Sequence, residues 1–329
     1  MTTLLNEISS IENLNRAFYQ CLRGKRRKPG AQKVFFIWGE LILKLQKNLL
    51  AGENYPWADY RQFWVTDPKR RLISSAPFLD RVAHRAIHNV IYPRLAPLLI
   101  SNSYACRENK GNGKAVRFLM KLLKDNPGSY VIKMDVKKFF NSINQYILFQ
   151  KLKRTLPDDS LSGLIIGLLK SHPDLQKGKG LPLGNLTSQI FANFYLNDID
   201  QRMQELTKGR YIRYMDDLLI FADTKEEMKN HLSEMKKLAS REQLEFPQKK
   251  RAIYAPGTNI PFLGFLVNAG KAIPLNRNKR MMMMKLKEKV QRGDPDYRIL
   301  RSVLSYNAWM NYPNSTLADG SSFCGPSRR

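Results

Sequence analysis

The alternation of apolar and polar residues along the chain predicts a mixture of helices and short strands. Strands are predicted by short apolar runs at 60–66, 71–75, 130–136, 211–215, 218–221 and 261–267. Helices are predicted at 31–50, 79–99, 115–123, 147–156, 161–169, 187–203, 225–241, 277–292 and 298–310. The middle of the chain therefore runs strand, helices, strand pair, helix, strand. That order predicts an α+β fold, in which helices back an antiparallel sheet of the split βαβ type.

Glycine, proline and small polar residues mark the breaks between these elements. Asp67-Pro68 predicts a turn between the first two strands, and 178–184 is a loop with three glycines and one proline. Residues 314–329 are rich in serine and glycine, so we expect a disordered tail there.

The charge balance changes the picture from fold to partner. The chain has 329 residues, enough for a core divided into two or three lobes. Lys and Arg number 55 against 28 Asp and Glu, which gives a formal charge of +27 spread along the whole sequence. Such self-repulsion is most easily tolerated by a protein that works on a polyanion, so we expect a nucleic-acid partner. A membrane surface is less favoured, because the sequence shows no amphipathic basic anchor.

The expected location is the cytoplasm. No apolar segment has the length of a transmembrane helix, and residues 1–10 lack the pattern of a secretory signal. Cys21, Cys106 and Cys324 are odd in number and far apart, which indicates a reducing compartment without a disulfide framework or a zinc site.

Three aspartates carry the candidate chemistry. Asp216-Asp217 lies between two apolar strands, and Asp135 ends another. Taken alone, each is a common kind of turn or strand-end residue. If the strands are neighbours, the three carboxylates converge at one edge of the sheet. Hard oxygen ligands suit Mg²⁺, and two such ions about 4 Å apart can hold the attacking and leaving oxygens of an in-line displacement.

The residues around these aspartates resemble the ordered motifs of reverse transcriptases. Residues 214–217 (YMDD) resemble the family's YMDD box, and 133–140 (KMDVKKFF) are similar to its first catalytic motif. Residues 180–189 (GLPLGNLTSQ) resemble the motif between them, and 262–265 (FLGF) resemble the primer-grip hairpin. Arg71, Arg81 and Arg107 match basic positions of the fingers motifs. Order and spacing agree over roughly residues 61–265.

Two further strings narrow the resemblance. Residues 183–189 (LGNLTSQ) and 103–107 (SYACR) are similar to enzymes of bacterial or phage diversity-generating retroelements. That family implies copying of a template RNA into error-prone, adenine-mutagenised cDNA, which rewrites a target gene by mutagenic retrohoming. It also implies a basic, homo-oligomeric accessory variability protein as partner. The alternatives are another short bacterial reverse transcriptase, of group II intron, retron or defence type, or a non-catalytic RNA-binding protein with the same fold.

The resemblance implies a right-hand polymerase. Its fingers would span 1–125 with an N-terminal helical extension, and its palm 126–270 with inserted fingers helices around 145–185. A small helical thumb would span 271–313, before the tail.

The implied catalytic residues are Asp135, Asp216, Asp217 and Lys250, with Lys249 as the alternative lysine. Two Mg²⁺ ions, for which Mn²⁺ can substitute, would bind the three aspartates and the Val136 backbone carbonyl. Because neighbouring strand residues point to opposite faces, we expect Asp135 and Asp216 to be the main ligands and Asp217 to support them.

Further roles concern the nucleotide and the nucleic acid. The implied dNTP-binding residues are Lys69, Arg70, Arg71, Phe140 as steric gate, Leu183 and Gly184. Template RNA, cDNA and their hybrid would contact Arg81, Arg107, Ser188, Gln189, Tyr214, Met215, Leu263, Gly264, Arg277, Lys279 and Trp309. Most relatives carry Gln where this chain has Leu183, and leucine can only pack against a base pair, which predicts lower fidelity. His84 and His88 are interpreted as surface or nucleic-acid-facing residues, and Phe139 as a core residue.

Overall fold

The structure is a computed structural model that describes residues 3–26, 29–66, 70–171 and 178–314. The chain divides into two compact units, each assembled from several stretches of sequence. The first unit comprises Met1–Ile100, Val136–Ile199 and Leu238–Glu245. The second unit comprises Ser101–Asp135, Asp200–Lys237 and Phe246–Arg329. The predicted division into fingers, palm and thumb is a finer assignment and stays a prediction.

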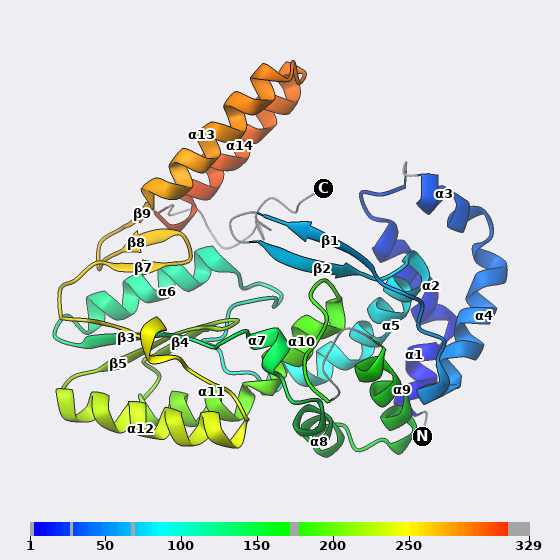
Figure 1. Cartoon of the computed structure of the whole chain (residues 1–329), viewed down its shortest axis with the longest axis horizontal. Coiled ribbons are helices and arrows are strands. Elements are labelled where there is room, and N and C mark those ends of the chain that lie inside the picture. Colours follow the sequence, from blue (N-terminus) through cyan, green and yellow to red (C-terminus); the bar gives the residue numbers. More distant parts are fainter. Residues whose placement is uncertain (1–2, 27–28, 67–69, 172–177, 315–329) are drawn as a thin grey trace. The chain divides into compact units, whose positions relative to one another are not determined.

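The first unit is mainly helical (Figure 1). Its helices are α1 (Leu4–Ser9), α2 (Ile11–Leu22), α3 (Pro29–Phe36), α4 (Trp38–Leu50), η1 (Gly52–Asn54), α5 (Phe78–Leu95), η2 (Ala96–Leu98), α7 (Phe139–Ser142), α8 (Gln145–Thr155), α9 (Asp159–Lys170) and α10 (Leu186–Tyr195). Helix α5 packs against both α2 and α10. Its apolar residues Val82, Ala86 and Val90 recur every four positions and are buried, so this face forms the centre of the unit.

A two-stranded hairpin completes the first unit. Strands β1 (Arg61–Val65) and β2 (Arg71–Ser75) pair antiparallel, with Val65 opposite Arg71. The expected turn at Asp67-Pro68 lies outside the described residues. Most of β1 is exposed, including Trp64, over whose ring the Arg70 guanidinium lies at 4.2 Å. The hairpin therefore presents aromatic and cationic side chains to solvent.

The second unit is built on an antiparallel sheet. The order of its strands is β4 (Tyr211–Tyr214), β5 (Asp217–Ala222), β3 (Tyr130–Asp135) and β6 (Ala252–Tyr254). A second sheet contains β7 (Ile260–Phe262), β8 (Phe265–Val267) and β9 (Ala272–Pro274). The helices are α6 (Asn112–Asp125), η3 (Gln248–Lys250), α13 (Asn276–Gln291), α14 (Asp296–Asn311) and η4 (Tyr312–Asn314), while α11 (Asn197–Leu206) and α12 (Lys225–Arg241) belong to it for most of their length.

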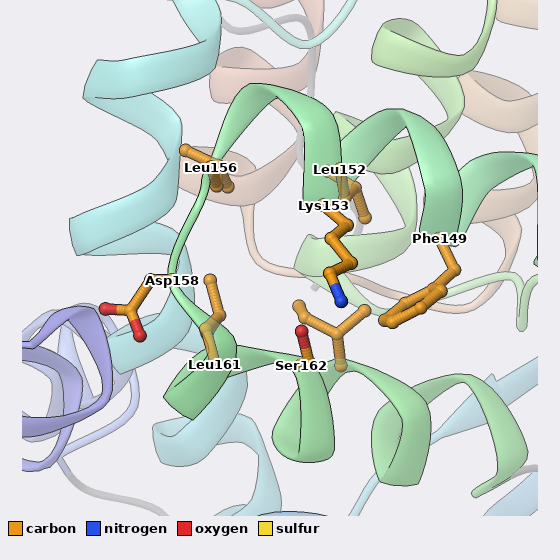
Figure 2. A pocket seen from close by; sticks show the side chains of 8 residues that line it. Phe149, Leu152, Lys153, Leu156, Asp158, Leu161 and Ser162 are labelled. Atoms are coloured by element: carbon orange, nitrogen blue, oxygen red, sulfur yellow. The ribbon is translucent and has the colours of Figure 1, made fainter.

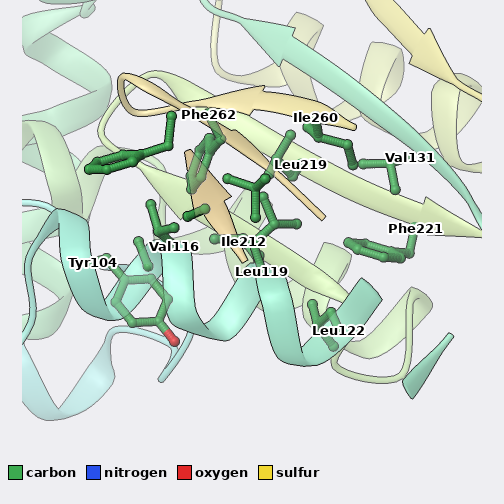
Figure 3. Packing of buried hydrophobic residues seen from close by; sticks show 14 residues of the cluster. Tyr104, Val116, Leu119, Leu122, Val131, Ile212, Leu219, Phe221, Ile260 and Phe262 are labelled. Carbon is green, nitrogen blue, oxygen red and sulfur yellow. The ribbon is translucent and has the colours of Figure 1, made fainter. Parts of the chain in front are cut away.

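The core of the second unit lies between the two sheets and α6 (Figure 3). The register sets Val131 opposite Phe221 and Ile212 opposite Leu219, so these four side chains share one face of the first sheet. Leu119 of α6 is buried in the same cluster. Each fully buried large apolar side chain contributes about 1.5–3 kcal/mol. The opposite face of the strands carries Arg213.

Three predicted elements differ in detail. The predicted helix at 31–50 is interrupted at Ile37, and the one at 187–203 ends at Tyr195, with a new helix from Asn197. The predicted strand at 261–267 is a hairpin, because Leu263 and Gly264 both take left-handed conformations, with φ of 47° and 94°. Two consecutive left-handed residues make the tight turn that joins β7 to β8.

Within the described part of the chain, no helix combines the length and apolarity that crossing a bilayer requires.

Candidate active site

Two of the catalytic candidates, Asp216 and Asp217, lie on the β4–β5 hairpin. Tyr214 pairs with Asp217, so the turn consists of Met215 and Asp216 alone. The sequence places both aspartates in the turn, whereas the structure makes Asp217 the first residue of β5. Met215 has a φ of 56°, a left-handed conformation that non-glycine residues adopt at some cost. The tip of the hairpin is therefore a strained position, which is typical of functional turns.

Asp135 lies directly opposite Asp217 in the β3–β5 register. Residues paired in this way project from the same face of a sheet. Lys133, two residues before Asp135, lies on that face too, and its Nζ is 3.9 Å from the Asp217 carboxylate. The register therefore does not support the alternation argument that ranked Asp217 behind Asp216. The ranking among the three carboxylates stays a prediction.

Lys250 is brought to these carboxylates from η3. Its Nζ donates a hydrogen bond to Oδ1 of Asp135. Lys249, the alternative lysine, is exposed on the same short helix. Lys250 therefore contacts a candidate carboxylate in this structure, whereas the sequence alone does not favour one of the two lysines over the other.

The donor set matches a metal that does not need a closed protein cage. Among the residues that the structure describes, no group of three or more His, Cys, Asp and Glu side chains is arranged to hold a metal ion. Mg²⁺ is usually bound by one or two carboxylates, with water and substrate phosphates completing its octahedron. Two opposed carboxylates on strand ends, Asp135 and Asp217, fit that mode of binding. They fit a structural zinc site poorly, since such sites use four cysteine or histidine ligands.

A buried ion pair lies on the other face of the hairpin, and the sequence reasoning did not find it. Arg213 and Asp200 are both 0% exposed, and Nη2 of Arg213 is 2.5 Å from Oδ2 of Asp200. Nη1 of Arg213 donates to the carbonyl oxygen of Met215 at 3.2 Å. The sequence does contain an arginine inside the apolar run 211–215. A solvent-exposed position within the strand would explain that arginine equally well.

The nucleotide-binding candidates of the first unit are connected through backbone atoms. The Ser74 N–H of β2 donates to the Leu183 carbonyl at 2.9 Å, and the Leu181 N–H donates to the Phe140 carbonyl at 2.8 Å. Phe140 is half-buried, while its neighbour Phe139 is buried, as predicted. The loop that carries Leu183 is therefore hydrogen-bonded to both β2 and α7.

Gly184 shows how closely that loop approaches β2. Its φ is 127°, and an added Cβ would lie 2.5 Å from the Ser74 carbonyl oxygen. Only glycine fits both the conformation and the space. Arg71 is exposed on the same strand as Ser74, whereas Lys69 lies outside the described residues.

The predicted nucleic-acid contacts fall into three groups. Arg277 and Lys279 are exposed on α13, Arg81, Arg107, Gln189, Tyr214, Met215, Leu263, Gly264 and Trp309 are partly buried, and Ser188 is only 3% exposed. Ser188 is therefore buried in this structure, and its predicted contact with nucleic acid stays a prediction. Near the β7–β8 turn, the Trp309 ring packs on Phe265 with centroids 4.5 Å apart, and Asn278 donates to the Gly264 carbonyl at 3.0 Å. These contacts attach α13 and α14 to the predicted primer-grip turn.

The structure contradicts the expectation that His84 of α5 is a surface residue, while His88 is partly exposed. His84 is 2% exposed, and its Nδ1 lies 2.8 Å from the Thr187 hydroxyl of α10. Burial lowers the pKa of His84 to about 3, so the ring is neutral. His88 stacks on Tyr92 with centroids 4.8 Å apart, and burial, with Arg85, lowers its pKa to about 4. His84 thus joins two helices and does not face nucleic acid.

A small pocket lies elsewhere in the first unit, at α8 and α9 (Figure 2). It is lined by Phe149, Leu152, Lys153, Leu156, Asp158, Leu161, Ser162 and Ile165. None of the predicted site residues lines it, and it carries no chemistry that the site needs.

Comparison with known proteins identifies relatives. Residues 66–267 match the family described as reverse transcriptase (RNA-dependent DNA polymerase). Protein YkfC of Escherichia coli is 25% identical over 170 residues, which cover 49% of this chain and 45% of that protein. The group II intron-encoded protein LtrA of Lactococcus lactis is 22% identical over 227 residues, which cover 65% of this chain and 37% of that protein. The chain therefore spans less than half the length of these relatives.

Among solved structures, apo telomerase from Candida tropicalis, truncated from its C-terminal domain, superimposes with a TM-score of 0.49 at 14% identity. The alignment covers 67% of this chain and 55% of that one.

Proposed function

The chain belongs to the reverse transcriptase family, and from that premise we propose that it is an RNA-directed DNA polymerase that copies a template RNA into cDNA. The observation that carries the proposal is the pairing of Asp135 with Asp217 beside a turn that contains Asp216. Three carboxylates at adjoining strand ends are costly unless cations neutralise them, and Lys133 and Lys250 lie beside two of the three. Reverse transcriptase domains are generally dependent on divalent metals, which supply those cations.

Asp135, Asp216 and Asp217, with the Val136 carbonyl, would hold two Mg²⁺ ions, or Mn²⁺ in their place. The bound ions would supply positive charge at the attacking and leaving oxygens. The primer 3′-hydroxyl would lose its proton to water and form a bond to the α-phosphorus of a dNTP while the bond to pyrophosphate breaks. Lys250 would give a proton to the departing pyrophosphate, in line with its position beside Asp135.

Residues of the first unit would select the nucleotide. Arg71, with Arg70 and Lys69, would pair with the triphosphate, since a guanidinium matches phosphate oxygens geometrically. The half-buried ring of Phe140 would clash with a 2′-hydroxyl and exclude ribonucleotides. Leu183 would pack against the new base pair without a hydrogen bond, which lowers discrimination by about 1–2 kcal/mol.

The low discrimination at Leu183 supports a mutagenic role. We infer that the enzyme serves a bacterial or phage diversity-generating retroelement and acts in the cytoplasm, with a basic accessory protein. Its cDNA would carry errors at template adenines. A group II intron-type enzyme is the second candidate, and the similarity to the intron-encoded protein LtrA is the observation that supports it.

Primer extension on an RNA template with dNTPs and Mg²⁺ tests the activity, with an Asp216→Ala variant as control. Extension by the wild type alone is expected. If neither protein extends the primer, the polymerase proposal fails, and RNA binding by the wild type would then support the non-catalytic alternative. Sequencing of the cDNA separates the remaining candidates, because errors concentrated at adenines support the retroelement role and evenly distributed errors contradict it.

A further inference from the structure

Arg213 and Asp200 form the buried ion pair on the face of the β4–β5 hairpin opposite Asp217. Both carboxylate oxygens of Asp200 accept hydrogen bonds. Nε of Arg213 is 2.7 Å from Oδ1 of Asp200, and Nη2 is 2.5 Å from Oδ2. The Tyr211 hydroxyl donates to the same Oδ1 at 2.9 Å. The guanidinium is therefore held in a fixed plane by two parallel contacts, which lysine could not reproduce.

The remaining nitrogen of that guanidinium reaches the catalytic turn. Nη1 donates to the Met215 carbonyl at 3.2 Å, in the strained two-residue turn that contains Asp216. Burial alone would lower the pKa of Arg213, but Asp200 raises it above its ordinary value, and Asp216 contributes to that increase. Arg213 thus stays charged and attracts Asp216 from behind.

The backbone of Arg213 is fixed as well. Its N–H donates to the Asn102 carbonyl at 3.0 Å, and its carbonyl accepts from the Tyr104 N–H at 2.9 Å. Both bonds join β4 to the segment 102–104, and on its other side Arg213 lies opposite Leu218 of β5. A fixed backbone and a fixed guanidinium together leave the turn little freedom to move.

Stability alone is a weak reason for such a pair. Burying two charges costs several kcal/mol, and an apolar pair of similar volume is often equally stable. The first unit contains a comparable case in Lys151, whose Nζ is 2.7 Å from Glu242, with both residues 7% exposed. Lys151 also donates to the Tyr195 carbonyl at 2.8 Å, which is not part of the candidate site. The pair at Arg213 differs because its third contact is the catalytic turn.

We propose that Arg213, oriented by Asp200, is a positioning residue that fixes the Met215–Asp216 turn in the geometry needed to bind the divalent metal. The inference rests on the proposed polymerase function. Interactions that orient a metal ligand typically change metal affinity or activity by about 10–100-fold when they are removed.

The test compares two double variants that replace a buried ion pair by apolar residues. Arg213→Met with Asp200→Leu removes the pair under the turn, and Lys151→Met with Glu242→Leu is the matched control. Thermal unfolding, Mn²⁺ binding by electron paramagnetic resonance and primer extension are measured on each. The first variant is expected to bind Mn²⁺ about 10-fold more weakly or worse and to lose kcat without a matching rise in the primer KM. The control is expected to keep wild-type Mn²⁺ affinity, whatever its melting temperature.

A third variant keeps the test valid if the first fails to fold. Arg213→Lys retains a charge opposite Asp200 but cannot bind that carboxylate at two points and reach Met215 as well. We expect it to fold, with Mn²⁺ affinity between those of the wild type and the double variant. Wild-type Mn²⁺ affinity in a folded Arg213 variant would overturn the proposal, as would wild-type protein that binds no Mn²⁺. If the wild type binds Mn²⁺ but extends no primer, the polymerase proposal fails while the positioning role is still measured.

Discussion

In the second unit, Asp135 and Asp217 face each other across a strand pair, and the adjoining turn is fixed by the side chain of Arg213. In the first unit, Leu183 is held near β2 by a main-chain hydrogen bond, which the Ser74 N–H donates to the Leu183 carbonyl. The turn of the second unit is therefore held by a buried side chain next to the candidate carboxylates. The loop of the first unit is held through its backbone, which leaves its side chains replaceable.

This difference teaches where each property of a polymerase can change. A substitution at Asp135 or Asp217 removes a charge that we expect to bind metal, while the backbone pairing of β3 with β5 remains. A substitution at Leu183 alters what a base pair contacts, while the Ser74 hydrogen bond and the glycine at 184 keep the loop in place. We therefore expect rate to depend on the second unit and selectivity on the first.

The largest expected effect follows from removing a carboxylate. Asp135→Asn keeps the size of the side chain but removes the charge that would bind a metal, so primer extension should fall on the order of 10³-fold. The same change at exposed Asp125, at the end of α6, is the control and should leave the rate unchanged. Equal rates for the two variants would mean that the paired carboxylates are not the centre of the chemistry.

Lys250 should come next in the size of its effect. A general acid typically contributes about 10²–10⁴-fold, so Lys250→Ala should lower kcat by about 10²-fold or more. Lys249→Ala removes a neighbouring charge from the same short helix and should change kcat little. Single-turnover extension measures both. If Lys249→Ala is the slower enzyme, the proton donor has been assigned to the wrong lysine.

Gly184 tests whether the backbone framework of the first unit matters at all. Gly184→Ala forces a Cβ to within 2.5 Å of the Ser74 carbonyl oxygen at a φ of 127°, so the loop must move away from β2. Such strain costs about 1–3 kcal/mol. We expect the dNTP KM to rise about 10-fold, with kcat changed less.

Gly178→Ala is the matched control for that change. Gly178 lies in the same loop with a φ of 77°, but an added Cβ would meet nothing within 4 Å. Steady-state kinetics at saturating primer gives the dNTP KM of both variants. A rise in Gly184→Ala alone would come from the contact with Ser74, because both positions have a positive φ. A KM that rises equally in both variants would contradict the role given to the contact with Ser74.

The local parts of this architecture are the ones that the sequence predicts well. Helix α12 has the predicted bounds, 225–241, because its amphipathic pattern is regular and charged residues occupy one face. Strand β2 and the hairpin around Asp216 follow from short apolar runs with turn residues between them. The α+β class and the reverse transcriptase family, inferred from ordered motifs, are confirmed.

The non-local parts could not be derived in the same way. Asp217 is the partner of Asp135 because of the β3–β5 register, and a shift of one residue would have paired Asp216 instead. Histidine is polar, and the sequence therefore predicts a surface position for His84. It is buried because α10 covers it, and its Nδ1 shares a hydrogen bond with the Thr187 hydroxyl. The Arg213–Asp200 pair joins residues 13 positions apart through tertiary packing. Patterns within one element carry no information on these contacts.

Leu183 is the residue of the first unit that we expect to set selectivity between bases. Leu183→Gln introduces a side chain that can hydrogen-bond a nucleotide, and about 1–2 kcal/mol of added discrimination corresponds to roughly 10-fold fewer errors. The rate for the correct base pair should stay within about twofold, since the loop backbone is unchanged. Sequencing of cDNA from a template that contains all four bases measures both. An unaltered error spectrum would show that this side chain does not set fidelity.

The smallest effect on activity is expected at His84, which acts on stability through pH. Its pKa is about 3 in the folded chain against an ordinary value of 6.5, so below pH 6.5 the unfolded chain binds a proton that the folded chain does not. The free energy of unfolding should therefore fall as the pH falls from 6.5 toward 3, by up to about 1.4 kcal/mol per pH unit. His84→Asn removes this contribution, whereas Thr187→Val loses the hydrogen bond but keeps the titrating ring. Urea unfolding across this range should give a shallower pH dependence for His84→Asn alone. A slope equal to that of the wild type would mean that the pKa of His84 is not lowered in the folded protein. The ring between α5 and α10 would then be protonated below pH 6.5.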